Sequence, residues 1–235
     1  MKIFVGYDER ESIAYHVFIQ SLIEHSTQRL DITPLVLKTL AGYRETHTDG
    51  SNAFIYSRFL IPELMGYSGW AAFFDGDMIA RADINELFEL RNPKFAVQVV
   101  KHEYTTKYPK KYLGSKNEDY PRKNWSSVVL WNCGHPSNKV LTKDFVMSAP
   151  GSQLHRFNWL DDDLIGGLPK AWNWLDLEYP ENEEAKLVHF TVGTPCFKDY
   201  RSSRAAGEWF ALYAIANSGF DDTRQRLIGG GEDPI

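Results

Sequence analysis

Two carboxylates separated by one glycine follow an apolar run in the stretch WAAFFDGDM, residues 70–78. A short apolar run bounded by turn residues is typical of a buried strand, which would leave Asp75 and Asp77 at its end, next to solvent or a cleft. The two charges repel each other unless a cation lies between them, and Gly76 has no side chain to block a close approach. Carboxylate oxygens suit Mg²⁺ or Mn²⁺. The alternative is that Asp-Gly-Asp forms only a surface turn.

A second acidic group lies in the stretch NWLDDDLIGG, residues 158–167. Asp161, Asp162 and Asp163 precede an apolar Leu-Ile pair, and carboxylates in such a position are typical of a helix N-terminus. A helix N-cap needs one acidic side chain, so a run of three also indicates a functional site. The sequence leaves both interpretations open.

The composition of the chain narrows the class of protein. Its 235 residues suit one catalytic domain, and a content of 14% aromatic residues suits either stacking on sugars or a rigid core. A net charge of −5 argues against a nucleic-acid partner. Cys133 and Cys196 lack paired spacing, which predicts reduced thiols. No signal peptide and no run of ~20 apolar residues is evident, so we expect a cytoplasmic protein without a membrane span.

The elements that must position these acids alternate between strands and helices. This alternation favours a mostly parallel sheet with helices on both faces, and such sheets bind ligands beyond the carboxyl ends of their strands. Asp8 follows the first predicted strand, and Asp75 and Asp77 follow the third, so we expect all three at one rim. Strands are predicted at residues 2–6, 32–38, 70–74, 95–100, 126–132 and 186–190, and helices at 11–25, 52–65 with an interruption near Pro62, 84–90, 137–148 and 205–219.

Residues 101–123 form a long polar segment that carries seven Lys or Arg residues, three acids and several tyrosines. Long loops are often functional, so this segment is a candidate acceptor site for an anionic glycan or a lid. The alternative is a solvated loop with no partner. We expect one domain over residues 1–228 and a flexible C-terminal tail over residues 229–235.

The order of these motifs resembles a known family. Asp-x-Asp after a strand, Asp-x-Asp-Leu-Ile followed by LPKAWNWL, and the late stretch HFTVGTP are similar to the family 8-like retaining glycosyltransferases, the glycogenin and bacterial galactosyltransferase group. The resemblance implies an α/β fold of GT-A type, a Rossmann-like sandwich around a mostly parallel central sheet in a single domain. It also implies sugar transfer from a nucleotide-sugar donor, expected to be a UDP-sugar. The acceptor could be a glycan, a lipid-linked molecule or a protein.

The resemblance implies roles for individual residues. Mn²⁺ or Mg²⁺ would be held by Asp75, Asp77 and His189, although His189 could instead be a core histidine. Asp162 or Asp163, with Asp161 beside them, would lie near the anomeric carbon, where a carboxylate stabilises positive charge on the sugar ring. The residues implied in donor binding are Val5, Gly6, Tyr7 and Asp8 at the base, Arg58, Asp75 and Gly76 near the sugar and phosphates, and Ser126 and Ser127 at the sugar.

The late motif departs from the family pattern of His-Phe-x-Gly followed by Lys-Pro-Trp. Here Gly193 comes one residue late, and TPCF lacks the lysine. The candidates for binding phosphate in its place are Lys198 and the backbone amides of Gly193 and Thr194. Two other functions stay open: a sugar nucleotidyltransferase, although GYDERES is poor in glycine, and a catalytically silent sugar-nucleotide or glycan-binding module. Homo-oligomer formation is also left open.

Overall fold

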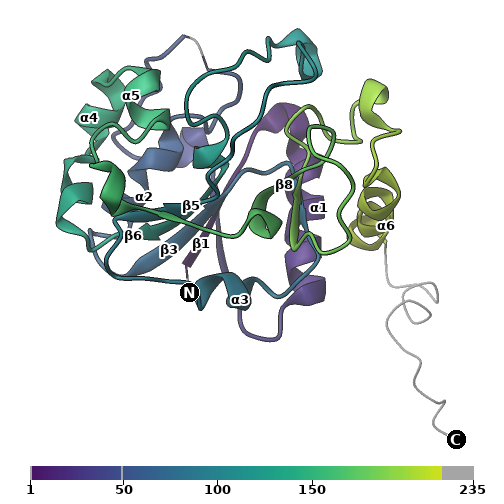
Figure 1. The fold of residues 1–235 in the computed structure, drawn as a ribbon, viewed down its shortest axis with the longest axis horizontal. Coiled ribbons are helices and arrows are strands. Elements are labelled where there is room, and N and C mark those ends of the chain that lie inside the picture. The colour runs from purple at the N-terminus through teal and green to yellow at the C-terminus, as the bar shows by residue number, and fades with distance from the viewer. Residues whose placement is uncertain (1, 49, 219–235) are drawn as a thin grey trace, which may run out of the picture.

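The computed structural model describes residues 2–48 and 50–218, and the predicted tail at residues 229–235 lies outside the described residues. Its central layer is a six-stranded sheet in the order β2-β1-β3-β6-β5-β7, beside a three-stranded sheet in the order β4-β9-β8 (Figure 1). The strands are β1 Lys2–Gly6, β2 Asp31–Leu35, β3 Trp70–Phe74, β4 Met78–Ala80, β5 Val97–Val99, β6 Val128–Asn132, β7 Ile165–Gly167, β8 Trp174–Leu175 and β9 Leu187–His189.

The central sheet is mostly parallel, as the sequence predicts. β1 pairs in parallel with β2 and β3, and β5 pairs in parallel with β7, whereas β6 is antiparallel to both β3 and β5. The inner strands β1, β3, β6 and β5 are largely buried on both faces because helices and loops cover both sides, whereas the edge strand β2 is mostly exposed or half-buried. Two large clusters of buried side chains result, one around Phe59 and Trp131 and the other around Phe18 and Phe74.

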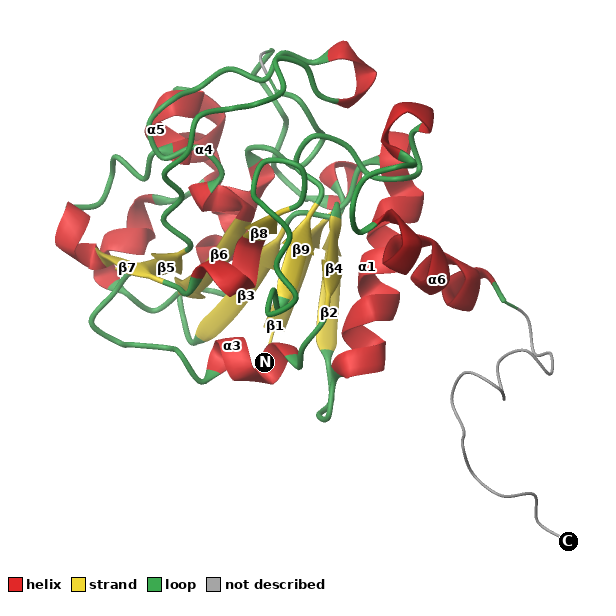
Figure 2. Cartoon of the chain, turned by 45° about the vertical axis from the view of Figure 1, so that its right-hand side comes forward, coloured by secondary structure: helices red, strands yellow, loops and turns green. Residues whose placement is uncertain are grey.

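Helices flank the sheets and complete a mixed α/β fold. α1 packs against β4 and against α6, and the two helices lie together at one side of the molecule (Figure 2). A third apolar cluster around Trp209 fills the space beneath α6. The helices are α1 Ser12–His25, α2 Ile61–Leu64, α3 Ile84–Phe88, α4 Lys143–Ser148, α5 Gly151–His155 and α6 Ala206–Asn217. No helix within the described ranges is long and apolar enough to cross a membrane.

Two predicted helices differ from the structure. Between residues 52 and 65, only a 3-10 turn at Ser57–Leu60 and α2 are helical, and Pro62 lies in the first turn of α2, where its missing N–H costs nothing. The helix predicted at residues 137–148 is two elements, because the Thr142 side chain caps α4 by accepting from the Phe145 amide.

The loops gather at one end of the sheet, opposite the end where the N-terminus lies (Figure 2). At this end β3 leads into Asp75, and β1 leads into Tyr7 and Asp8. A Cβ atom on Gly76 would lie 2.4 Å from the Gly6 carbonyl oxygen, so only glycine allows the Asp-Gly-Asp turn to approach β1 this closely. Residues 101–123, teal in Figure 1, arch over the same end.

Candidate metal and donor site

The predicted metal ligands converge from three different strands. Asp75 follows β3, Asp77 precedes β4, and His189 ends β9, which pairs with β4 so that His189 lies opposite Met78. The side chains of all three are buried, and one potential ligand atom from each lies within 4.8 Å of the others. Two buried carboxylates and an imidazole at this spacing fit a divalent cation, because carboxylate oxygens and an imidazole nitrogen that face one another this closely can bind the same ion.

The orientation of His189 is fixed by a residue that the sequence did not single out. His189 Nδ1 lies 3.0 Å from Asn173 Oδ1, while the Asn173 amide donates to Ser127 Oγ at 2.7 Å. Nδ1 therefore carries the proton, and Nε2 faces the acids, 3.3 Å from Asp77 Oδ1 and 3.8 Å from Asp75 Oδ2. A hydrogen bond on the far nitrogen is the usual support for a metal-binding histidine. Asn173 lies in LPKAWNWL, so the motif carried this signal.

Arg58 pairs with the first of the two acids. Its guanidinium lies over the Phe73 ring, and Nη1 lies 2.7 Å from Asp75 Oδ1 and donates to the Ser126 carbonyl oxygen at 2.9 Å. Burial raises the pKa of Asp75 to about 6 in spite of Arg58. Burial also opposes the charge on Asp77, but His189 outweighs it and lowers the pKa of that carboxyl. In the absence of a metal ion, the pKa of Asp75 is therefore higher than that of Asp77.

A third buried acid lies beneath the long loop. Glu11 accepts a hydrogen bond from the Tyr112 hydroxyl at 2.7 Å, and burial together with the Asp77 charge raises the Glu11 pKa to about 8. Tyr112 also stacks on Phe197, with ring centroids 4.8 Å apart. This contact anchors residues 101–123 over the acids, and neither Glu11 nor Tyr112 was identified from the sequence.

Two further side chains line the cavity of the acids: Lys111 from the long loop and His155 from the end of α5. Lys111 donates to Thr191 Oγ1 at 3.2 Å, and burial lowers the Lys111 pKa although Asp77 and Asp75 act against this shift. His155 Nδ1 lies 2.8 Å from Ser126 Oγ, and burial lowers the His155 pKa well below its usual value, so this imidazole is neutral. The sequence indicated a lysine-rich loop, which contains Lys111, but it did not single out this residue. No pattern in the sequence pointed to His155.

Two cavities are lined by the side chains around the acids, and a third lies at the ends of β1 and β2. A cavity of about 70 Å³ contains the Asp75, Asp77 and His189 side chains together with Arg58, Lys111 and the predicted Ser126 and Ser127. A neighbouring cavity of about 310 Å³ shares Lys111, Tyr120 and His155 with it. The largest cavity, about 650 Å³, lies at the ends of β1 and β2 and is lined by the predicted Tyr7 and Asp8 with Arg10, Lys38, Tyr43 and Arg44.

Of the four residues predicted to bind the base, two line the cavity at the ends of β1 and β2 and two lie beneath it. Asp8 is buried and bound by the Arg10 side chain and the Ala53 amide, 2.9 Å away. Burial works against its charge, yet Arg10 and the backbone amides lower the Asp8 pKa. Val5 is buried inside β1, and a Cβ atom on Gly6 would lie 2.3 Å from the Phe54 ring. Tyr7 and Asp8 can therefore reach a ligand, whereas Val5 and Gly6 shape the backbone beneath them.

Other predicted residues lie away from the buried acids. Asp161–Asp163 precede β7, which begins beside Val97 and approaches the site only with its last residue, Gly167. The Asp162 side chain is 85% exposed and pairs with Arg122, and Asp161 forms no side-chain cap. The catalytic role of this run stays a prediction.

The late motif is split between buried and exposed residues. Thr194 is buried, with its hydroxyl 2.9 Å from Cys196 Sγ, and a Cβ atom on Gly193 would lie 2.4 Å from the Tyr200 ring. Lys198 is exposed and does not line any of the three cavities above. The phosphate-binding role of these residues also stays a prediction.

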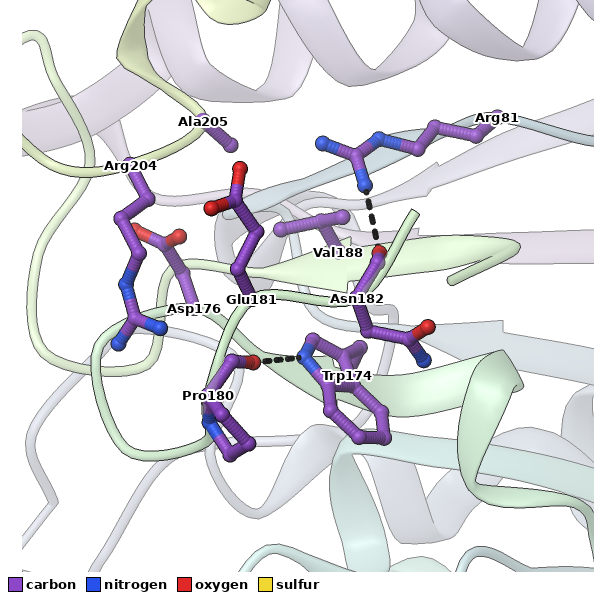
Figure 3. Close-up of a pocket in the computed structure, with 9 residues that line it drawn as sticks. All are labelled: Arg81, Trp174, Asp176, Pro180, Glu181, Asn182, Val188, Arg204 and Ala205. Atoms are coloured by element: carbon purple, nitrogen blue, oxygen red, sulfur yellow. Dashed lines mark hydrogen bonds between the residues drawn. The ribbon is translucent and has the colours of Figure 1, made fainter. Parts of the chain in front are cut away.

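A separate hollow lies on the other side of β8 and β9 (Figure 3). Its volume of about 30 Å³ is close to that of one water molecule in the liquid. Arg81 donates to the Asn182 carbonyl oxygen, and Trp174 donates to the Pro180 carbonyl oxygen at 2.9 Å, so its walls are held by internal bonds. This hollow is too small for a substrate.

Solved glycosyltransferase structures share this architecture. The galactosyltransferase LgtC, in complex with donor and acceptor sugar analogues, is 12% identical with a TM-score of 0.59, and the match covers 97% of this chain and 100% of that one. The bifunctional glycosyltransferase WbbM is 16% identical with a TM-score of 0.59, over 96% of this chain. This chain spans about half of WbbM, 51% of its length. At such low identity the likeness shows the fold alone, which is the GT-A fold.

Sequence comparison adds one relative at much higher identity. No family model matches the chain. Protein CDI of Arabidopsis thaliana is 42% identical over 217 residues, which cover 88% of this chain and 84% of the relative. An identity this high over nearly the full length of both chains shows common membership, and the chain belongs to the family of protein CDI.

Proposed function

We propose that this protein is a metal-dependent glycosyltransferase that transfers a sugar from a UDP-sugar to an acceptor with retention of configuration. The observation that carries the proposal is the buried group of Asp75, Asp77 and His189 at the loop-covered end of a GT-A sheet. Neither a turn nor a core histidine needs two carboxylates and an imidazole nitrogen facing one another out of water.

The three buried side chains would hold Mn²⁺ or Mg²⁺. The cation would act as a Lewis acid that stabilises the negative charge growing on the diphosphate as the bond to the sugar breaks. Asn173 keeps His189 Nε2 directed at the acids, and Arg58 keeps Asp75 in place. No protein acid is then needed at the leaving group. A proton competes with the cation for Asp75, because burial raises the pKa of this carboxyl, and the cation would displace it on binding.

The cavities suggest how a donor is arranged. The cavity of about 650 Å³ at the ends of β1 and β2 has room for a nucleoside between Tyr7, Tyr43 and the cations of Arg10 and Arg44. The sugar would then lie in the adjoining cavities beside Ser126 and the neutral His155. LgtC was solved with donor and acceptor sugar analogues in a fold of the same type, which supports this arrangement.

The proposal is tested by calorimetric titration of a nucleotide-sugar panel with Mn²⁺ or with chelator, followed by a hydrolysis assay on the same samples. We expect metal-dependent binding of a UDP-sugar and slow release of UDP. Binding without any turnover, with or without acceptors, would indicate the silent binding module. Pyrophosphate release from a nucleoside triphosphate and a sugar phosphate would indicate the nucleotidyltransferase.

A further inference from the structure

Lys111 is held over the buried acids by a small hairpin within the long loop. Residues Lys110 and Lys116 form an antiparallel bridge, and the Lys111 amide donates to the Ser115 carbonyl oxygen at 2.8 Å. The next residue, Tyr112, binds the Val192 carbonyl oxygen through its amide at 2.9 Å. With the Tyr112 hydroxyl on Glu11, these contacts fix the backbone of Lys111 against the segment that follows β9.

The ammonium group of Lys111 makes fewer and longer hydrogen bonds than that of Lys123. Within the described part of the chain, the Lys111 Nζ hydrogen bond goes to the Thr191 hydroxyl at 3.2 Å. Lys123 Nζ instead donates to Thr106 Oγ1, Asn117 Oδ1 and the Glu118 carbonyl oxygen, at 2.6, 2.6 and 2.9 Å. Lys123 is therefore satisfied by the fold, whereas Lys111 lines the cavity of the acids with most of its hydrogen-bonding capacity unused.

Charge balance shows what Lys111 can bind. The cavity of the acids is lined by two carboxylates, Asp75 and Asp77, and by two cations, Arg58 and Lys111, so it is neutral without a metal. A divalent cation on the acids leaves two positive charges in excess, in a site that water reaches poorly. The ligand that restores balance is a dianion, and the diphosphate of a nucleotide sugar carries two negative charges.

We propose that Lys111 binds the donor diphosphate and makes the binding of metal and diphosphate interdependent. The inference rests on the proposed function. Before the donor arrives, the Lys111 charge offsets the acids and weakens the binding of metal alone. Once the metal is present, the same charge attracts the diphosphate, so each ligand favours the other. Lys111 would supply from the long loop the phosphate contact for which Lys198 and the backbone amides of Gly193 and Thr194 were the candidates.

The test is calorimetry on Lys111→Gln, with Lys116→Gln as the matched control, because Lys116 lies on the same hairpin with an 85% exposed side chain. Mn²⁺ is titrated into metal-free protein, and UDP and uridine are each titrated into Mn²⁺-saturated protein. Losing a charge-assisted hydrogen bond should weaken UDP binding at least about tenfold. Losing a nearby cation should tighten Mn²⁺ binding about threefold or more. Uridine affinity should not change.

The opposite signs separate a direct role from damage to the fold. A purely structural role for Lys111 would weaken Mn²⁺, UDP and uridine binding together, and that result would overturn the inference. Wild-type affinity for both Mn²⁺ and UDP in Lys111→Gln would overturn it as well, and a tenfold loss in Lys198→Gln in that case would return the role to Lys198. If wild-type protein binds no UDP with Mn²⁺, the proposed function itself fails.

Discussion

Asp75-Gly76-Asp77 and Asp161–Asp163 are alike in composition and opposite in surroundings. Asp75 and Asp77 are 9% and 8% exposed and face His189, whereas the Asp162 side chain is 85% exposed and pairs with Arg122. The first pair follows the end of a central strand, and the second run precedes the start of an edge strand. Acids become suited to binding a metal ion when strand direction brings them to a shared rim and burial removes the water that would otherwise solvate their charges.

The largest expected effect on donor binding is for a substitution in the buried pair, in contrast to the exposed Asp161–Asp163 run. We expect Asp77→Asn to weaken metal-dependent donor binding by about a hundredfold or more, because the variant lacks one of two charges that hold the cation. The melting temperature should fall modestly, because asparagine keeps the size of the side chain but loses the favourable interaction of the Asp77 charge with His189. Titration calorimetry of a UDP-sugar with Mn²⁺ measures this effect. A variant that binds the donor as tightly as wild type would show that the cation lies elsewhere.

The next effect concerns the partner of the buried pair. Arg58→Ala leaves Asp75 buried without its cation, so we expect the free energy of unfolding to fall by about 3 kcal/mol. Donor binding should weaken by about 2 kcal/mol or more, since the substitution also removes the positive charge of the guanidinium beside the expected sugar and phosphate positions. Saturating Mn²⁺ should recover part of the lost stability by offsetting the Asp75 charge. Thermal unfolding with and without Mn²⁺ checks this, and an equal loss in both conditions would contradict it.

Burial also sets the charge of a histidine outside the acids. His102 donates to or accepts from the Tyr179 hydroxyl at 2.8 Å, and burial, with the His189 and Lys170 charges, lowers its pKa to about 3. The unfolded chain takes up this proton near pH 6.5, so the native state binds fewer protons between these values. Stability from His102 is therefore present above pH 6.5 and is lost as the pH falls toward 3.

The expected loss from His102 between pH 7 and pH 5 is about 2 kcal/mol in the free energy of unfolding. Urea unfolding at both pH values measures it. His102→Gln keeps a polar side chain but cannot titrate, so the difference between the two pH values should shrink by about that amount. An unchanged pH dependence in the variant would show that His102 titrates in the native state as it does in the unfolded chain, which would contradict the lowered pKa.

The smallest effects are expected for the exposed acids. Asp161→Asn, Asp162→Asn and Asp163→Asn should each keep donor affinity within about threefold and stability within about 0.5 kcal/mol, because exposed pairs contribute little. Steady-state kinetics then tests the catalytic prediction. A fall in kcat without a change in donor KM supports a carboxylate that acts in the transition state, whereas normal kcat in all three removes the run from the mechanism.

Much of the fold followed from local patterns in the sequence. Apolar runs ending in charged residues located β1 and β3, and the parallel direction of these strands places Asp8 at the same end of the sheet as Asp75 and Asp77. The glycine at position 76 was also interpretable, because a side chain there would strike the Gly6 carbonyl oxygen. These features depend on neighbours within a few residues or on strand order, which patterns report well.

The parts that the sequence did not reveal depend on long-range contacts. Glu11 meets Tyr112 across 101 positions, and His155 reaches Ser126 from α5 across 29. Lys111 looks like any other lysine of a basic loop until the hairpin places it on the acids. The exposure of Asp161–Asp163 likewise depends on the pairing of β7 with β5 at the edge of the sheet. Three consecutive acids give no information about that pairing.

The most direct test of the central claim is a crystal structure with Mn²⁺ and UDP, with anomalous diffraction used to locate the manganese. We predict an anomalous peak bound by Asp75, Asp77 and His189, with diphosphate oxygens completing its coordination and Lys111 Nζ within hydrogen-bonding distance of the same diphosphate. Manganese bound elsewhere, or UDP bound with no metal between it and the two aspartates, would contradict the account.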